Sequence, residues 1–272
     1  MKRKVLPEVL AGEKISALAI TEPSGGSDVA NLKTTARREG DHYVVNGSKM
    51  FITSGMRADY YTVAVRTGGP GAGGVSLLLI ERDREGFART KLKKMGWWAS
   101  DTAQLFFDNV KVPVENLIGE ENRGFIGIML NFNSERLGMA AGACGYARVC
   151  LDEAIAYARE RHTFGKPLIA NQVVRHRLVD MAMRINAVKS TLELLAWRVG
   201  QGEKPVAEIC MLKNLATSTM EYCANEAMQI FGGAGYLRGA KVERIYRETK
   251  VMSIGGGSTE IMKDLAARQM GL

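Results

Sequence analysis

Short runs of alternating apolar and polar residues fill the first half of the chain, a pattern typical of β-strands separated by turns. Asn46-Gly47 lies between two such runs and predicts a type I′ hairpin. The glycine-rich run Gly68–Gly74 precedes a strand rather than a helix, so it predicts a flexible hairpin connection and not a nucleotide-binding loop. The predicted strands are Ile15–Ile20, Tyr43–Val45, Lys49–Thr53, Tyr61–Arg66, Val75–Ile80 and Leu105–Val112.

From Gly124 onward the apolar residues recur with the period of helices. Further helices are expected at Val206–Phe231, before Ile254, and after Ser258, which can cap the last one. Within Gln172–Val199 the apolar positions alternate steps of four and three, which predicts a bundle seam. The seam residues are Val174, Leu178, Met181, Ile185, Val188, Leu192 and Leu195.

These patterns predict an α+β protein in which an antiparallel β-barrel or sandwich is followed by an antiparallel helical bundle. Residues 1–13 read as the end of a helix closed by Gly12. Residues 14–122 then form the β-domain, and residues 123–272 form a C-terminal α-domain of the four-helix type.

Composition narrows the class of protein. The formal charge of +8 comes from Lys and Arg scattered among acids, so a polyanionic small molecule accounts for it as well as nucleic acid does. No apolar run is long enough to span a bilayer, and we expect no membrane partner. The four cysteines lack metal-ligand spacing and the three histidines are dispersed, which favours reduced thiols, no metal site and a cytoplasmic location.

Candidate chemistry centres on Asn131–Ala147, a helical stretch that carries the adjacent pair Glu135-Arg136. Small residues follow the pair at helical spacing, which lets another backbone or a flat ligand approach closely. Taken alone, Glu135 is either an exposed residue of a first helical turn, favoured by the helix dipole, or a carboxylate held in a pocket.

Four other segments can each be interpreted in two ways, as part of a ligand site or as an ordinary structural feature. The loop Leu18–Asp28 offers hydroxyls and backbone N–H groups to a ring or a phosphate, or is simply a turn. Phe51-Ile52-Thr53 presents an aromatic face and a hydroxyl, or is an ordinary strand end. Arg161–Lys166 and Gln229–Gly233 each close a helix and are read equally well as C-terminal caps.

Six segments in order, TEPSGGSD, FIT, SERLGMAAG, RHTFGK, QIFGG and IGGGSTEIMK, together resemble the acyl-CoA dehydrogenase family over nearly the whole chain. The resemblance implies an FAD cofactor, an acyl-CoA thioester substrate, a role in fatty acid metabolism, and electron-transferring flavoprotein as the acceptor. It also implies a homotetramer, or at least a dimer, in which neighbouring subunits complete each FAD site. No nucleic-acid partner is expected.

The resemblance also assigns roles residue by residue. Phe51 stands where many members have Trp, and Asn133 stands where Asp is more usual. Positions matching substrate contacts are Ser27, Asn133, Arg136, Gly256 and Gly257. Positions matching FAD contacts are Leu18, Ile20, Thr21, Ser27, Phe51, Ile52, Thr53, Arg161, Thr163, Phe164, Gln172, Gln229, Gly232, Gly233, Ser258 and Glu260.

Glu135 is the predicted catalytic base. Many family members carry the base in a late Tyr-Glu-Gly-Thr motif, where this chain has Gly256 in place of the Glu. A subset resembling the long-chain and isovaleryl enzymes places it immediately before the helix arginine, which is the position of Glu135. We therefore expect Glu135 to take the α-proton while a hydride passes to flavin N5, giving a trans-2-enoyl-CoA. Gly256 keeps the backbone N–H that the family uses at the developing enolate oxygen.

One departure leaves alternatives open. Family members usually carry an N-terminal helical domain before the segment LPEVLAGE, and this chain begins almost at that segment. We expect an acyl pocket open on one side unless a partner subunit replaces that domain. An acyl-CoA oxidase and a non-catalytic FAD-binding subunit are the alternative functions.

Overall fold

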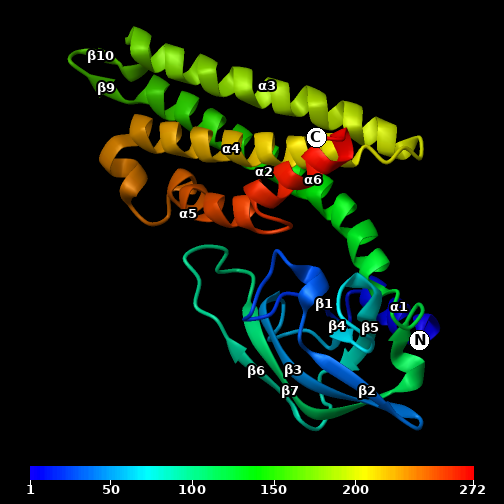
Figure 1. Ribbon diagram of the computed structural model, residues 1–272. Coiled ribbons are helices and arrows are strands. Elements are labelled where there is room, and N and C mark those ends of the chain that lie inside the picture. The colour runs from blue at the N-terminus through cyan, green and yellow to red at the C-terminus, as the bar shows by residue number, and fades with distance from the viewer. The chain divides into compact units, whose positions relative to one another are not determined.

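The computed structural model describes all residues from Met1 to Leu272. The chain forms two compact units, Met1–Leu130 and Asn131–Leu272. The first is built on a β-sheet and the second on helices, and Figure 1 shows the elements of both. This confirms the predicted α+β class, with the sheet preceding the helical bundle.

A single sheet organises the first unit. Its strands follow the order β6-β7-β3-β2-β4-β5-β8, and β1 pairs with β4. Both β1 and β2 run parallel to β4, whereas the other pairs are antiparallel, so the sheet is mixed and open rather than a closed antiparallel barrel. The elements are α1 (Lys2–Leu10), β1 (Ser16–Ala19), β2 (Thr35–Glu39), β3 (His42–Thr53), β4 (Tyr60–Arg66), β5 (Val75–Glu81), β6 (Phe87–Lys91), β7 (Thr102–Pro113) and β8 (Leu117–Ile118).

The core of this unit forms on one face of the sheet because alternate strand residues point the same way. Buried side chains from β1, β2, β3, β4, β5 and β7 belong to one cluster, and the edge strand β6 adds Phe87. The Phe87 ring stacks on Phe107 and meets Tyr61 edge-on, with ring centroids 5.1 and 4.9 Å apart. These aromatic contacts attach the edge strand to the central strands.

The predicted hairpin at Asn46-Gly47 is wrong. The runs on either side of it form one strand, β3, whose pairing with β7 shifts register between Val45 and Gly47. The hairpin instead joins β2 to β3 through Gly40 and Asp41, since Glu39 pairs with His42. Gly47 has φ 142°, and a Cβ there would lie 2.7 Å from the Thr34 Cα, so this glycine permits a close backbone approach rather than a turn.

Five helices and a short β-hairpin form the second unit, with the unit boundary falling inside α2. Six of the seven predicted seam residues of α3 are buried, and Leu192 is half-buried. The central helix α4 packs against α3, α5 and α6. As predicted, Ser258 caps α6 by accepting a hydrogen bond from the Ile261 N–H. The elements are α2 (Gly124–Glu160), β9 (His162–Thr163), β10 (Lys166–Pro167), α3 (Gln172–Gly200), α4 (Val206–Phe231), α5 (Lys241–Ile254) and α6 (Thr259–Met270).

All four cysteines are free thiols. No helix combines the length and the apolar character needed to cross a membrane. No group of three His, Cys, Asp or Glu side chains is arranged to hold a metal ion.

A buried ion pair fixes the loop between β1 and β2. The Lys49 ammonium donates to Glu22 Oε1 at 2.8 Å and to the Ile20 carbonyl at 3.0 Å. Glu22 also accepts the backbone N–H groups of Lys33 and Thr34 at 2.6 and 2.9 Å. Burial lowers the pKa of Lys49 to about 8, so the side chain is still mainly a cation at neutral pH. Burial would raise the pKa of Glu22, but the Lys49 charge and these hydrogen bonds hold it below its usual value.

Removing one member of this pair should strongly destabilise the sheet unit. In Lys49→Met the Glu22 carboxylate stays buried without its counter-charge, and we expect a loss of about 3–5 kcal/mol in the free energy of unfolding. The double variant Glu22→Gln/Lys49→Met leaves no buried charge and should recover much of that loss. Urea unfolding of the three proteins measures both effects. A single variant as stable as the wild type would contradict the role given to the pair.

The role of Gly47 is tested by a single methyl group. Gly47→Ala should cost about 1–3 kcal/mol, because the added Cβ meets the Thr34 backbone and the residue must keep a positive φ. The control is Gly69→Ala in the β4–β5 connection, where a Cβ meets nothing within 4 Å. Equal melting temperatures for the two variants would show that no close approach is needed at residue 47.

Candidate functional site

The loop that leaves β1 is held against the end of β3, which joins two of the predicted FAD segments. The Met50 N–H donates to the Thr21 carbonyl at 2.8 Å. Glu22 and Gly25 exchange two backbone hydrogen bonds, of 3.2 and 3.1 Å, which close the loop into a tight turn. Ile20 is buried, Leu18 and Thr21 are half-buried, and Ser27 is exposed on the same loop.

Phe51 turns its ring outward beside this loop. The side chain is 66% exposed and the backbone has φ 60°, an unusual conformation for an aromatic residue. Its neighbour Ile52 is buried at 2%, while Thr53 is exposed. Strained backbone of this kind is concentrated at ligand sites. The exposed aromatic face, with the threonine hydroxyls and the loop backbone beside it, fits a flat heteroaromatic ring such as a flavin.

In the helical unit, Arg136 connects α2 to the glycine loop Gly255–Gly257, which lies between α5 and α6. Arg136 is 4% exposed, and its Nε donates to the Gly256 carbonyl at 3.1 Å. Its Nη1 donates to Asn133 Oδ1 at 3.2 Å, and its guanidinium lies 5.5 Å from the Phe132 ring centroid. Three of the predicted substrate residues, Asn133, Arg136 and Gly256, are therefore linked by hydrogen bonds.

Glu135 projects from the same turn of α2 and is exposed. The amide of Asn131, one turn earlier, donates to its Oε1 at 2.6 Å. This hydrogen bond orients the carboxylate, while Arg136 turns inward to the glycine loop.

The backbone and surroundings of residue 256 suit a glycine. Gly256 has φ 65°, and a Cβ there would lie 2.7 Å from the Met139 Sδ. Gly257 has φ 105°, and its missing Cβ would collide with the end of Met262. A glutamate in this loop therefore requires both a strained backbone and displacement of Met139.

Ser258 and Glu260 directly follow the glycine loop at the start of α6. Glu260 is exposed, and hydrogen bonds from its own backbone N–H and from the Ser258 hydroxyl lower the pKa of its carboxyl. These two predicted FAD residues therefore belong to the same local group as Arg136.

The remaining predicted FAD residues lie at the other end of α2. Arg161, Thr163 and Phe164 are in or beside the β9–β10 hairpin, where Phe164 has φ 51° and is fully exposed. The rings of Tyr157 and Phe231 stack with centroids 4.3 Å apart, which joins the ends of α2 and α4. This contact places the hairpin and the end of α4 at one end of the unit, as Figure 1 shows. Also at this end are the exposed residues Gln172, Gln229, Gly232 and Gly233.

The residues around the glycine loop and those near the β9–β10 hairpin are far apart within the helical unit. Arg136 and Arg161 are separated by 25 positions along the chain, nearly all within α2, which corresponds to about 37 Å of helix. The predicted residues thus form three local groups, namely the β1 loop with Phe51, the glycine-loop group, and the hairpin-end group.

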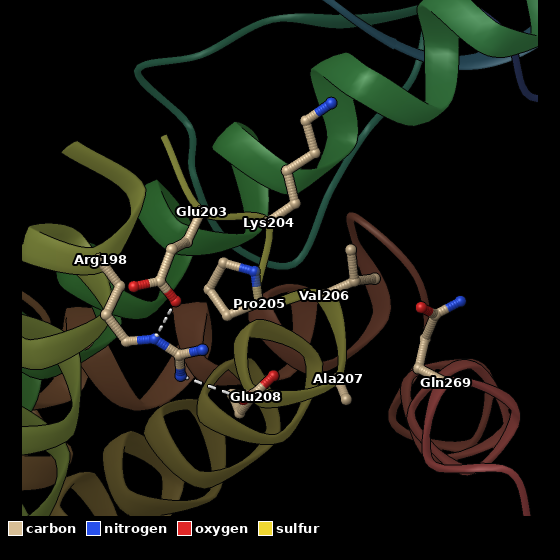
Figure 2. Close-up of a pocket in the computed structure, with 8 residues that line it drawn as sticks. All are labelled: Arg198, Glu203, Lys204, Pro205, Val206, Ala207, Glu208 and Gln269. Atoms are coloured by element: carbon tan, nitrogen blue, oxygen red, sulfur yellow. Dashed lines mark hydrogen bonds and ion pairs between the residues drawn. The ribbon is translucent and has the colours of Figure 1, made fainter. Parts of the chain in front are cut away.

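A surface pocket lies elsewhere, at the connection between α3 and α4 (Figure 2). Arg198 in its wall pairs with Glu203 and Glu208 at 2.7 and 3.0 Å, and Lys204 extends away from them. None of the predicted site residues lines it.

Sequence patterns missed four residues that shape the site, namely Glu22, Lys49, Met139 and Lys213. One signal was present for Lys213, since this charged residue lies on the apolar stripe of α4 with Ile209, Ala216 and Met220. No comparable signal marked the ion pair of Glu22 and Lys49, because its partners are 27 positions apart.

Comparison with known proteins agrees with these motifs. The profile of the acyl-CoA dehydrogenase middle domain matches residues 17–110, and that of the C-terminal domain matches residues 122–271. Acyl-CoA dehydrogenase AFT10-1 of Alternaria alternata is 42% identical over 98% of this chain. The chain spans 65% of that relative's length, just under two thirds.

Solved structures have the same fold. The crystal structure of acyl-CoA dehydrogenase from Geobacillus kaustophilus superposes with a TM-score of 0.98 at 42% identity, covering 100% of this chain and 72% of that one. The prolyl acyl carrier protein oxidase AnaB superposes with a TM-score of 0.95 at 32% identity, covering 100% of this chain and 72% of that one. The chain belongs to the acyl-CoA dehydrogenase family of FAD-dependent oxidoreductases, as its ordered motifs predicted.

Proposed function

We propose that the chain carries the flavin-binding and proton-abstracting parts of an acyl-CoA dehydrogenase that forms a trans-2-enoyl-CoA, with Glu135 as the base. One observation carries this proposal. Arg136 links the helix turn that bears Glu135 to a glycine loop that carries no carboxylate at residues 255–257. The carboxylate lacking in the late loop is thus supplied from the adjoining turn of α2.

Glu135 has the properties that α-proton removal requires. The acidic proton lies on the carbon next to the thioester carbonyl, and its base must come within hydrogen-bond reach. The exposed carboxylate of Glu135 is accessible to a ligand and is oriented by the Asn131 amide. Bound FAD supplies the acceptor for the hydride that leaves the β-carbon.

Backbone N–H groups of the glycine loop are suited to the oxygen of the thioester. As the proton leaves, negative charge develops on this oxygen, and fixed donors stabilise it. The N–H groups of Gly256 and Gly257 donate to no acceptor within the chain. Arg136 holds the Gly256 carbonyl and so limits movement of the loop.

The three local groups indicate how FAD is held. The β1 loop with Phe51, Ile52 and Thr53 would contact the flavin ring, and Ser258 and Glu260 would contact the cofactor from the glycine-loop side. The exposed hairpin-end group would bind the adenine half. Because this group is about 37 Å along α2 from the glycine loop, we propose that two copies of the chain complete each FAD site, within a homodimer or homotetramer. Electron-transferring flavoprotein would then reoxidise the flavin in the cytoplasm.

An acyl-thioester oxidase is the second candidate, because the chain is also similar to the oxidase AnaB. The two activities share proton abstraction by Glu135 and differ in what reoxidises the flavin. Stopped-flow mixing of the reduced protein with oxygen distinguishes them. Reoxidation as fast as turnover indicates an oxidase, whereas slow reoxidation with turnover on an artificial acceptor indicates a dehydrogenase.

Cofactor binding is the first test. Purified protein should be yellow or should take up FAD at micromolar concentration, one per chain, because each of the three local groups is formed. Absorbance after gel filtration measures the uptake. Phe51→Ala should weaken the uptake, whereas Phe106→Ala, at another exposed phenylalanine of the same sheet, serves as the control. A protein that binds no FAD would refute the proposal.

The base is tested by Glu135→Gln, which keeps the shape of the side chain and removes its basicity. We expect FAD to stay bound, and flavin reduction by acyl-CoA to slow by about 10²–10⁴-fold. Anaerobic stopped-flow absorbance measures the reduction. The matched control is Glu193→Gln, an exposed glutamate on α3, which should reduce at the wild-type rate. Near-normal reduction in Glu135→Gln would mean that another group is the base.

A further inference from the structure

Lys213 is a buried cation without an acidic partner. Its side chain is 0% exposed, and it lies on the apolar stripe of α4. Its ammonium donates to the Gly257 carbonyl at 2.8 Å and forms no salt bridge. Burying an ammonium against a single neutral acceptor is costly, so an apolar residue would suit this position better for stability alone. Burial, reinforced by the charge of Arg136, lowers the pKa of Lys213 to about 8, which leaves it mainly charged at neutral pH.

Two other side chains, like Lys213, donate hydrogen bonds to backbone carbonyls between residues 256 and 259. Arg136 from α2 donates to the Gly256 carbonyl at 3.1 Å. Asn214, the next residue of α4, donates to the Thr259 carbonyl at 3.0 Å. The carbonyls of Gly256, Gly257 and Thr259 are thus each bound by a side chain from another helix.

The surrounding groups do not neutralise the two cations. Burial raises the pKa of the Cys210 thiol, so Cys210 is uncharged at neutral pH. The two neighbouring carboxylates, Glu135 and Glu260, are exposed and form no salt bridge with either cation. No salt bridge therefore compensates the positive charge beside the loop, which the exposed carboxylates of Glu135 and Glu260 offset only from a distance.

The N–H side of the same peptides is free. The carbonyl of Gly256 shares a peptide group with the N–H of Gly257, and the carbonyl of Gly257 shares one with the N–H of Ser258. A donor on a carbonyl polarises its peptide and strengthens the hydrogen bond that the N–H can donate. None of the N–H groups of Gly256, Gly257 and Ser258 donates within the chain. They also precede α6, whose N-terminal end favours negative charge.

We propose that Lys213 is a positioning residue for the dehydrogenation. Its ammonium holds the Gly257 carbonyl, which keeps the N–H groups of Gly256 and Gly257 in place and polarises the Ser258 N–H, and its charge favours the negative charge that develops on the thioester oxygen. This inference rests on the proposed function, and it adds a residue that never contacts the substrate. The charge of Lys213 matters as well as its hydrogen bond, because an uncompensated cation stabilises an anion in a poorly solvated site.

The test compares Lys213→Met, Lys213→Arg and the control Lys263→Met in the FAD-loaded protein. Lys263 is an exposed lysine on α6. A 3-oxoacyl-CoA serves as the probe, because its enolate is a stable analogue of the anion formed in the reaction. The pH at which the bound probe ionises is read from its absorbance. Flavin reduction by a saturated acyl-CoA gives the rate and the substrate affinity separately. Hydrogen exchange at Gly255 and Met262, whose N–H groups donate to the carbonyls of Val251 and Ser258 at the two ends of the loop, reports on the loop without requiring activity.

In Lys213→Met we expect the ionisation of the bound probe to shift upward by about one pH unit, a tenfold loss of anion stabilisation. The rate of flavin reduction should fall at least about tenfold, while FAD and substrate still bind. Loop exchange should accelerate, Lys213→Arg should restore part of each effect, and Lys263→Met should match the wild type. Unchanged ionisation and rate in a folded Lys213→Met protein would overturn the inference.

Failure of the proposed function gives a different result. In that case the wild type itself neither ionises the probe nor reduces its flavin with any acyl-CoA. Hydrogen exchange then decides the role of Lys213 by itself. Faster exchange at Gly255 and Met262 in Lys213→Met, but not in Lys263→Met, supports the positioning role, and equal exchange refutes it.

Discussion

Holding the glycine loop Gly255–Gly257 in place is the constraint on which the candidate site in the helical unit depends. Gly256 and Gly257 both have positive φ angles, and Met139 and Met262 fill the space that their side chains would need. Such a loop has little of its own to hold it, since glycine loses more conformational freedom on ordering than any other residue. The hydrogen bonds from Arg136 and Lys213 supply the restraint, because each ties one of the loop carbonyls to a packed helix.

The sheet unit uses the same kind of contact. There, the buried ammonium of Lys49 donates to the Ile20 carbonyl and so fixes the start of the loop that faces Phe51. The difference between the two lysines lies in their counter-charges. Lys49 has the buried carboxylate of Glu22, whereas Lys213 has none. A neutralised pair is suited to holding a loop, and an uncompensated cation is suited in addition to stabilising an anion.

Sequence patterns predicted the elements wherever burial follows a simple period. The α3 seam and the bounds of α4 were confirmed because their apolar residues recur at helical spacing. Strands β2 and β6 were missed because they are short, largely exposed and rich in charge. Asn46-Gly47 was misread because the need for glycine there comes from Thr34, a contact that local sequence does not encode.

The sequence motifs predicted which residues belong to the candidate site, but not which of them contact one another. Ordered motifs identified Glu135, Arg136 and the glycine loop, and the structure adds that a hydrogen bond links the last two. Lys213 was missed because it acts on Gly257, 44 positions away. Met139 was missed because it fills a space beside Gly256 that only the folded chain defines. That the hairpin-end group lies far along α2 from the glycine loop also follows only from the length of the helix.

The central claim is that the loop at Gly256 receives the thioester oxygen while Glu135 faces the α-carbon. A crystal structure of the FAD-loaded protein with a bound 3-oxoacyl-CoA tests this most directly. We expect the thioester oxygen at about 2.7–3.1 Å from a loop N–H, with a Glu135 oxygen within reach of the α-carbon. A thioester oxygen bound away from residues 256–258, or a different carboxylate at the α-carbon, would contradict it.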